Sequence, residues 1–331
     1  MSFSTYPYQK SFWEIKMKIV ILDSATLGED VDLSPIFKLG EVTEYKSTDA
    51  LQLRERIKDA DTVVVNKIKL GADELCCAEG LKLICVTATG YDNIDTDYCR
   101  DRGIALCNVP AYSTDSVAQV SAAMALSLVC HLNEYTDFVN RGDYSASGVA
   151  NRLTPVYHEI SSMTWGVVGG GAIGSQVARI AAALGARVLI CRRKHDERYE
   201  NADIDTLCRS ADIISLHVPL NDETRGLISR RRIAEMKPTA ILINTARGAV
   251  VDEEALAEAI ENERLGGAGI DVYSSEPFGG DHPFARIIGR DNVLLTPHMA
   301  WGAYEARERC VRIIANNIYS FYNQKSINRI V

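Results

Sequence analysis

The chain has 331 residues, a length that favours two domains over one. Hydrophobic residues make up 47% and charged residues 24%, the mix of a globular protein with a buried core, so intrinsic disorder is excluded as the main state. The formal net charge of −8 gives no global attraction to nucleic acid or to an anionic membrane, so neither is expected as a partner.

The N-terminal sequence and the cysteines predict a cytoplasmic protein without a metal. No apolar run approaches the length that spans a bilayer, and the first residues lack the order of a signal peptide. Adjacent Cys76 and Cys77 have no second pair at zinc-ligand spacing. Four of the nine cysteines lie in apolar runs, which is typical of reduced, buried thiols: Cys85, Cys107, Cys130 and Cys191.

From Met17 the chain alternates short apolar runs with amphipathic segments, and the residues before Met17 resemble an appendage. A helix is expected at Ala50–Ile57. Strands are expected at Lys18–Leu22, Thr62–Val65, Leu83–Thr87 and Ile104–Cys107. This alternation predicts a parallel sheet with helices on its faces.

A long apolar helix from Ser116 to about His131 comes next, followed by a polar, irregular segment from Asp143 to Ser162. The alternation then restarts, with helices at Ile173–Leu184 and about Ala303–Tyr322. Strands are expected at Thr164–Val168, Arg187–Cys191, Ile213–His217, Ala240–Asn244, Gly267–Val272 and Val293–Thr296. The whole pattern predicts an α/β fold with two doubly wound parallel sheets.

The run from Gly169 to Gly174 fits the pattern G-x-G-x-x-G. It follows an apolar strand and opens an apolar helix, the context in which glycines let a diphosphate approach the N–H groups of a helix N-terminus. A plain glycine-rich turn is the alternative, and the strand–turn–helix context favours dinucleotide binding.

The next strand ends in Arg192-Arg193-Lys194, where NAD-binding proteins commonly carry an acidic residue for the ribose. A guanidinium can hold a 2′-phosphate with two hydrogen bonds. The sequence therefore predicts a preference for NADP(H), with NAD(H) possible. The alternative is that these are solvated surface charges and that Asp196 binds the ribose.

Three polar segments follow later strands: Asn244–Gly248, Asp271–Pro277 and Thr296–Trp301. Since ligands bind beyond the carboxyl ends of such strands, Arg247, Glu276 and His298 should converge near the cofactor. Arg247 suits a substrate carboxylate, His298 suits proton donation to a keto oxygen, and Glu276 would orient the imidazole. Each residue alone is more ordinary as a surface charge, a structural histidine or a turn residue. Their joint occurrence after a nucleotide loop carries the hypothesis.

These segments resemble the signatures of the D-isomer-specific 2-hydroxyacid dehydrogenase family, from Met17 onward, and the details are most similar to its hydroxypyruvate-reducing members. The supporting motifs are Asn66–Ile68, Ala88–Asp95, Cys107–Val109, Tyr112–Gln119 and His298–Trp301, followed by Glu305–Arg307. The resemblance implies that Arg247, Glu276 and His298 are catalytic.

The resemblance also implies the remaining site residues. The backbone of Thr89 and Gly90 would grip the substrate carboxylate, Asp271 would hold the nicotinamide carboxamide, and no metal is involved. The expected substrate-binding residues are Lys67, Thr89, Gly90, Tyr91, Arg247, His298 and Trp301. The expected cofactor-binding residues are Gly169, Gly171, Ala172, Ile173, Gly174, Arg192, Arg193, Lys194, His217, Val218, Pro219, Leu220, Asn221, Thr224, Thr245, Ala246, Asp271 and His298.

The family topology implies that a Rossmann-type dinucleotide-binding domain (113–302) is inserted into a flavodoxin-like substrate domain (1–112 and 303–331). Closure of the cleft between them would expel water and bring Gly90 over the substrate opposite Arg247. A homodimer built on the cofactor domains is expected. The helix from Ser116 to His131 would either serve that interface or be buried in the core.

The implied reaction transfers a hydride between NADP(H) and a small 2-keto acid, favouring hydroxypyruvate or glyoxylate and yielding D-glycerate or glycolate. One alternative is a bulkier substrate such as phenylpyruvate, and another is a corepressor-like protein that senses the dinucleotide. Formate dehydrogenase activity is disfavoured because Glu276 is present.

Overall fold

The computed structural model describes residues 17–195 and 197–331. The chain divides into two compact units. Unit 1 comprises the chain up to Tyr112 together with Tyr304–Val331, and unit 2 comprises Ser113–Ala303. The expected appendage before Met17 lies outside the described residues.

Unit 1 is built on a five-stranded parallel sheet with the order β2-β1-β3-β4-β5. This is the flavodoxin-like order, which reverses direction between β1 and β3. Its strands are β1 (Lys18–Ile21), β2 (Glu41–Glu44), β3 (Thr62–Val65), β4 (Leu83–Val86) and β5 (Ala105–Cys107). β3 and β4 are buried along their whole length, which explains why their apolar runs were visible in the sequence.

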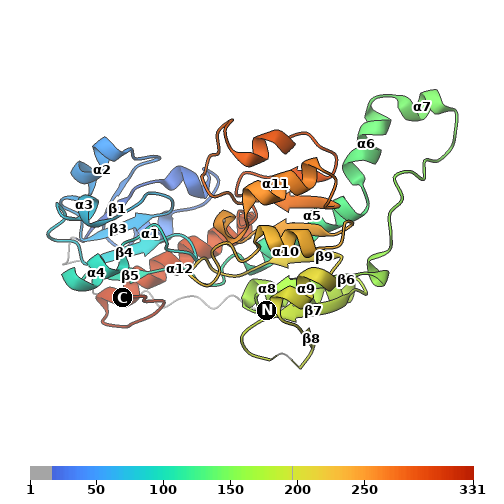
Figure 1. Cartoon of the computed structure of the whole chain (residues 1–331). Coiled ribbons are helices and arrows are strands. Elements are labelled where there is room, and N and C mark those ends of the chain that lie inside the picture. Colours follow the sequence, from blue (N-terminus) through green and yellow to red (C-terminus); the bar gives the residue numbers. More distant parts are fainter. Residues whose placement is uncertain (1–16, 196) are drawn as a thin grey trace, which may run out of the picture. The chain divides into compact units, whose positions relative to one another are not determined.

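The helices of unit 1 include one from the far end of the chain. They are the 3-10 helix η1 (Ser24–Leu27) and the α-helices α1 (Ser34–Phe37), α2 (Ala50–Ile57), α3 (Ala72–Leu75), α4 (Thr96–Arg102) and α12 (Tyr304–Tyr322). Figure 1 shows the red helix α12 beside the strands coloured blue to cyan. The side-chain amide of Asn317 on α12 donates to the backbone oxygen of Asn108 at 2.9 Å, so the C-terminal helix packs against the sheet of unit 1.

Unit 2 is built on a seven-stranded parallel sheet with the order β12-β11-β10-β9-β6-β7-β8. The order reverses between β6 and β9, as in Rossmann-type folds, so the prediction of two doubly wound parallel sheets is confirmed. The strands are β6 (Thr164–Val168), β7 (Arg187–Cys191), β8 (Glu200–Asn201), β9 (Ile213–Leu216), β10 (Ile241–Asn244), β11 (Gly267–Ile270) and β12 (Val293–Leu295).

Helices cover both faces of this sheet. The α-helices are α5 (Thr114–Val129), α6 (Leu132–Asn140), α7 (Asp143–Ser147), α8 (Ala172–Ala183), α9 (Ile204–Ser210), α10 (Arg230–Glu235) and α11 (Glu253–Glu261). Three 3-10 helices join them: η2 (Ile160–Ser162), η3 (Gly248–Val250) and η4 (Pro283–Ile287). α5 and α8 pack in one apolar cluster, and α9, α10 and α11 pack in the other.

Helix α5 belongs to the core of unit 2. Ala118, Ala122, Met124, Ala125 and Leu128 are buried within the cluster that includes β6 and β10. Of the two possibilities open for the long apolar helix, burial in the core is therefore the one that the packing favours.

The segment expected to be irregular from Asp143 to Ser162 was wrongly predicted in part, because α7 and η2 lie within it. Both are short, and α7 buries no residue, so neither leaves an apolar period in the sequence. Figure 1 shows α6 and α7 lying away from the sheet of unit 2. Within the described part of the chain, no single helix is long and apolar enough to cross a membrane, although α5 and α6, bent by 64°, pass that test together by length and composition.

Candidate active site

The glycine-rich loop joins β6 to α8. Gly169 has a φ of 104°, in the left-handed region, and its N–H donates to the backbone oxygen of Cys191 at 2.9 Å. A Cβ at Gly174 would lie 1.9 Å from the backbone oxygen of Gly169, so only glycine lets helix and turn approach this closely. A Cβ at Gly171, the N-cap residue of α8, would meet no atom within 4 Å. The open helix N-terminus therefore fits a dinucleotide diphosphate.

The basic run at the end of β7 lies against this loop. A Cβ at Gly170 would lie 2.6 Å from both Cδ and Nε of Arg192, so the missing side chain leaves room for the guanidinium. Arg192 is half-buried, whereas Arg193 and Lys194 are exposed, and Arg193 forms a surface ion pair with Glu223. The alternative in which Asp196 binds the ribose lies outside the described residues.

The end of β9 forms the neighbouring wall. The N–H of His217 donates to the backbone oxygen of Val168 at 2.7 Å, which ties this wall to β6. Among the described residues, neither ring nitrogen of His217 has a hydrogen-bond partner, and burial lowers the pKa of its imidazole to about 3. His217 is therefore neutral.

The expected adenine-side residues form a tight turn after β9. The Thr224 hydroxyl donates to the backbone oxygen of Pro219 at 2.6 Å, and the N–H of Asn221 donates to the Thr224 hydroxyl at 2.9 Å. Val218 and Leu220 are half-buried and pack against the core cluster of unit 2. The turn thus lies at the carboxyl edge of the sheet, where a nucleotide binds.

Asp271, directly after β11, is buried and braces the next loop. Its carboxylate accepts from the Thr296 hydroxyl at 2.5 Å and from the N–H groups of Met299 and Ala300 at 2.9 Å each. Burial raises the pKa of Asp271, and these hydrogen bonds act in the opposite direction. The contact of Asp271 with the nicotinamide carboxamide stays a prediction. The sequence did not predict the hydrogen bonds by which Asp271 holds the following loop.

His298 stands in a left-handed backbone conformation with a φ of 52°. This conformation costs a non-glycine residue about 1 kcal/mol, and neighbouring structure must hold it. The N–H of His298 donates to the backbone oxygen of Asp271 at 2.9 Å, and the carboxylate of Asp271 holds the two residues that follow. The strain is thus maintained at the residue expected to donate a proton.

The imidazole of His298 contacts the predicted carboxylate. Its Nδ1 lies 2.6 Å from Oε2 of Glu276, and Oε1 of Glu276 accepts from the N–H of Tyr273 at 3.0 Å. Both side chains are partly shielded from solvent. A carboxylate at Nδ1 fixes the tautomer and directs Nε2 to the opposite side of the ring. The pair therefore suits general acid–base chemistry at Nε2.

Arg247 lies three residues after β10 and is half-buried. The side-chain NH₂ group of Asn244 donates to the backbone oxygen of Arg247 at 2.9 Å. The side-chain oxygen of Asn244 accepts from the N–H of Ala246 at 3.0 Å. Thr245 is buried, with its hydroxyl 2.9 Å from that of Ser121. Because β10, β11 and β12 are adjacent and parallel, Arg247, Glu276 and His298 all follow strands at one edge of the sheet. Trp301 lies three residues beyond His298 and is half-buried.

The other expected substrate residues belong to unit 1. Lys67 follows β3 and is exposed, and its N–H donates to Asp23 at 2.7 Å. Burial raises the pKa of Asp23, and the backbone N–H donors act against it. Thr89, Gly90 and Tyr91 follow the neighbouring strand β4. The Thr89 hydroxyl donates to the backbone oxygen of Val109 at 2.9 Å, which leaves a braced loop at the carboxyl edge of this sheet.

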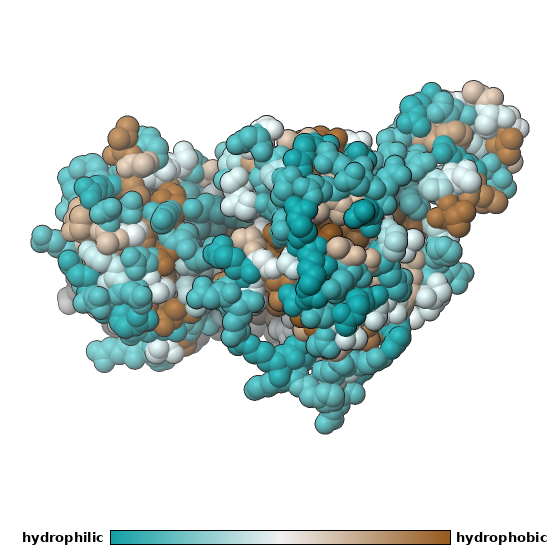
Figure 2. Space-filling model, viewed as in Figure 1, coloured by the Kyte–Doolittle hydropathy of each residue, from teal (hydrophilic) through white to brown (hydrophobic). Residues whose placement is uncertain are grey.

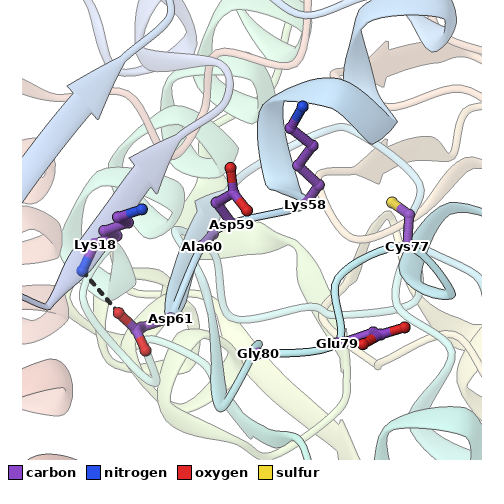
Figure 3. Close-up of a pocket in the computed structure, with 8 residues that line it drawn as sticks. All are labelled: Lys18, Lys58, Asp59, Ala60, Asp61, Cys77, Glu79 and Gly80. Atoms are coloured by element: carbon purple, nitrogen blue, oxygen red, sulfur yellow. Dashed lines mark hydrogen bonds between the residues drawn. The ribbon is translucent and has the colours of Figure 1, made fainter.

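A pocket in unit 1 lies at the opposite edge of that sheet. Lys18 begins β1 and Asp61 precedes β3, so this is the amino end of the strands, and their hydrogen bond measures 2.9 Å (Figure 3). Ligands of wound sheets bind at the carboxyl ends, so this pocket is no part of the candidate site. It is lined by Lys18, Lys58, Asp59, Ala60, Asp61, Cys77, Glu79 and Gly80.

Two buried ionisable residues of unit 2 were missed by the sequence reasoning. They are Glu253 and His282, and Oε2 of Glu253 lies 3.1 Å from Nε2 of His282. In the sequence, Glu253 looks like an ordinary first-turn acid of a helix capped by Asp252, and nothing local pairs it with a histidine 29 residues away.

The sequence is similar to those of known 2-hydroxyacid dehydrogenases and reductases. Residues 122–300 match the family described as D-isomer specific 2-hydroxyacid dehydrogenase, NAD binding domain. A hydroxypyruvate reductase of Blautia hydrogenotrophica is 32% identical over 321 residues, which is 94% of this chain and 99% of the relative. A glyoxylate reductase of Thermococcus litoralis is 35% identical over 277 residues, which is 81% of this chain and 82% of the relative.

Solved structures of related enzymes match the fold of this chain over both units. An acyclic imino acid reductase in complex with NADPH and D-arginine superposes with a TM-score of 0.84 at 30% identity, covering 95% of this chain and 100% of that one. A D-lactate dehydrogenase from Aquifex aeolicus, complexed with NAD and lactic acid, gives 0.83 at 31% identity, covering 93% and 96%. As its motifs predicted, the chain belongs to the D-isomer specific 2-hydroxyacid dehydrogenase family.

Proposed function

We propose that the enzyme reduces hydroxypyruvate or glyoxylate to D-glycerate or glycolate, with NADPH as the preferred reductant. The observation that carries this proposal is the 2.6 Å contact between Nδ1 of His298, which follows β12, and Glu276, which follows β11. Strand β11 is also the neighbour of β10, which precedes Arg247. The names of the two relatives support the choice of small substrates.

Each residue of the trio has a distinct role in this proposal. The guanidinium of Arg247 binds the substrate carboxylate. His298 donates a proton from Nε2 to the keto oxygen, and Glu276 orients the imidazole through Nδ1. The bound dinucleotide supplies the hydride that reaches the keto carbon. The product therefore gains one hydride at carbon and one proton at oxygen.

A substrate screen tests this function. Oxidation of NADPH is followed with hydroxypyruvate, glyoxylate, pyruvate and phenylpyruvate, and the two favoured acids should give the highest kcat/KM. A preference for phenylpyruvate would assign the enzyme to bulkier substrates. Turnover of none of the four would favour a protein that senses the dinucleotide.

The cofactor preference rests on Arg192. Its guanidinium lies where a side chain at Gly170 would stand, beside the loop that suits the diphosphate, and Arg193 and Lys194 add positive charge next to it. A 2′-phosphate gains charge-assisted hydrogen bonds at such a place, whereas a ribose hydroxyl gains little. NAD(H) remains a usable second cofactor in this proposal.

Replacing Arg192→Gln should lower kcat/KM for NADPH by about 10- to 100-fold, since charge-assisted hydrogen bonds contribute about 1.5–3 kcal/mol. The value for NADH should change little. Arg187→Gln is the matched control, because Arg187 is exposed at the other end of the same strand. Equal losses with both cofactors, or a wild type that favours NADH, would contradict the NADP assignment.

A homodimer formed through residues 132–157, which comprise α6, α7 and the chain that follows them, is part of the proposal. Six apolar side chains of this segment are half or more exposed: Leu132, Val139, Val149, Leu153, Val156 and Tyr157. Figure 2 shows several brown, hydrophobic residues gathered on this protruding end of unit 2. A concentration of exposed apolar side chains on one part of the surface is typical of a protein interface. The family resemblance supports a second copy of the chain as the occupant.

The double substitution Leu153→Glu with Val156→Glu should convert the dimer into a monomer. Light scattering coupled to gel filtration should then give 36.4 kDa, where the wild type gives twice that mass. Leu51→Glu is the control, because Leu51 is 94% exposed on α2 in unit 1. A wild type that elutes as a monomer, or a double variant that stays dimeric, would refute this interface.

The cysteines support a place in the cytoplasm. All nine are unpaired, and burial raises the pKa of Cys99 and Cys107 to about 11 and that of Cys208 to about 12. Such thiols stay protonated and unreactive in a reducing compartment.

A further inference from the structure

A buried hydrogen-bonded pair, Glu253 and His282, lies beside the catalytic trio. Glu253 is the first residue of α11, and His282 directly precedes η4. Nε2 of His282 lies 3.1 Å from Oε2 of Glu253, and the side chains are 5% and 8% exposed. Nδ1 of His282 accepts from the N–H of Phe284 at 3.2 Å, so Nε2 carries the proton and donates to Glu253. Burying a carboxylate is costly unless its hydrogen bonds are satisfied.

The carboxylate of Glu253 also holds Ser274. Oε1 accepts from the backbone N–H of Ser274 at 2.9 Å, and Oε2 accepts from the Ser274 hydroxyl. Ser274 itself is exposed and lies two residues before Glu276. Two donors of Ser274 therefore fasten the exposed loop to the carboxylate at the buried start of α11, and His282 is the third donor to that carboxylate.

Ser274 and its neighbour Tyr273 contact all three catalytic segments. The N–H of Tyr273 donates to Oε1 of Glu276, and its hydroxyl donates to the backbone oxygen of Thr296 at 2.8 Å, two residues before His298. Burial raises the pKa of Tyr273 to about 12, which keeps that hydroxyl a donor. A Cβ at Gly248, next to Arg247, would lie 2.0 Å from the carbonyl carbon of Tyr273.

Aromatic rings pack around His282 of the buried pair. The rings of Phe278 and His282 have centroids 4.9 Å apart, those of His282 and Phe284 are 5.1 Å apart, and those of Tyr273 and Phe278 are 4.6 Å apart. These rings lower the local dielectric, which strengthens satisfied hydrogen bonds and penalises a broken one. The anchor at Ser274 is therefore stiff.

We propose that Glu253 and His282 are positioning residues, which fix Ser274 and thereby hold Glu276 against Nδ1 of His298. The proposal rests on the proposed roles of His298 and Glu276. Without the anchor, the exposed residues 274–276 would sample several conformations, and the imidazole would be oriented for only part of the time. The loss would appear in the proton-transfer step and not in binding of the substrate carboxylate, because Asn244 holds Arg247 separately.

Glu253→Gln tests the proposal with a side chain of the same shape, whose NH₂ group opposes the donors of Ser274 and His282. The expected kcat falls about 10- to 100-fold, because hydrogen bonds to a buried charge contribute about 1.5–3 kcal/mol. The KM for the keto acid should stay within about twofold, because uniform binding is unaffected. Glu254→Gln is the matched control: it is the next residue of α11, on the surface, paired with Arg286, and both constants should stay at wild-type values.

A double-mutant cycle separates positioning from general loss of stability. If Glu253 acts through Glu276, then Glu253→Gln combined with Glu276→Gln should have the kcat of Glu276→Gln alone. Additive losses would overturn the proposal. Ser274→Ala removes only the hydroxyl of an exposed residue and should fold normally. Its smaller loss of kcat, about threefold to tenfold for one hydrogen bond, should vanish in the Glu276→Gln background as well.

A spectroscopic measurement needs no substrate. The proton on Nδ1 of His298, hydrogen-bonded at 2.6 Å, should give a far-downfield ¹H NMR resonance that His298→Ala assigns by removing it. The resonance should persist in Glu254→Gln and be lost or shifted in Glu253→Gln. An unchanged resonance in folded Glu253→Gln would overturn the positioning role. Failure of the keto-acid screen, with this result intact, would count against the proposed function alone.

Discussion

His298→Ala should lower kcat for keto-acid reduction by about 10²- to 10⁴-fold, the range that general acid–base catalysis contributes. The physical reason is the geometry of the ring: Glu276 occupies Nδ1 at 2.6 Å, so Nε2 is the nitrogen that can deliver the proton. Alanine leaves Arg247, the proposed ligand of the substrate carboxylate, in place, and the KM for the keto acid should change by only a few-fold. Steady-state oxidation of NADPH over a range of keto-acid concentrations gives both constants.

His131→Ala is the control for this substitution. His131 is also a histidine of unit 2 with a left-handed backbone, φ 51°, but it caps α6 and lies outside the proposed site. Its variant should retain wild-type kcat. If His298→Ala turned over at nearly the wild-type rate, the proton donor would have to be another group.

Arg247→Ala should damage both constants, with a loss in kcat/KM of about 10³-fold or more, because a bidentate pair with a carboxylate is replaced by an unpaired charge in the site. The KM should rise because the ground-state carboxylate loses its partner, and kcat should fall because the keto carbon is held less well. Arg247→Lys should recover only part of the loss, since an ammonium is a point charge that lacks the planar fork.

Arg290→Ala serves as the control for Arg247, because Arg290 is an exposed arginine of the same unit, near the start of β12. Melting temperatures of all variants show whether a loss reflects unfolding. A KM for the keto acid that stays at the wild-type value in Arg247→Ala would remove Arg247 from the substrate site.

Much of the site was readable from the sequence because it depends on local patterns. The glycine spacing from Gly169 to Gly174 predicts a tight turn that lies close against the following helix. The structure has this arrangement, because a Cβ at Gly174 would lie only 1.9 Å from the backbone oxygen of Gly169. Arg247, Glu276 and His298 each follow an apolar strand, and the carboxyl ends of parallel strands share one edge of a sheet. These local patterns can be recognised in the sequence without knowing how the helices and strands pack.

Other features left no local signal. Strand β2 was not predicted, because an edge strand with the sequence Glu-Val-Thr-Glu is half-exposed and has no apolar run. Helix α7 buries no side chain, so it leaves no helical period. The left-handed backbone of His298 is imposed by hydrogen bonds to Asp271, 27 positions earlier in the chain, and its own neighbours do not encode it.

The amino-acid sequence by itself determined the fold class, and it predicted the phosphate loop and the catalytic trio, because strand periodicity, glycine requirements and strand-end chemistry act over a few residues. Tertiary structure alone decided how those residues are held. Glu253 contacts Ser274 and His282, Asp271 contacts the loop of His298, and Arg192 lies over Gly170. These contacts join segments about 20 to 30 residues apart, and no local pattern reports them because their energy arises only when folding brings the buried partners together.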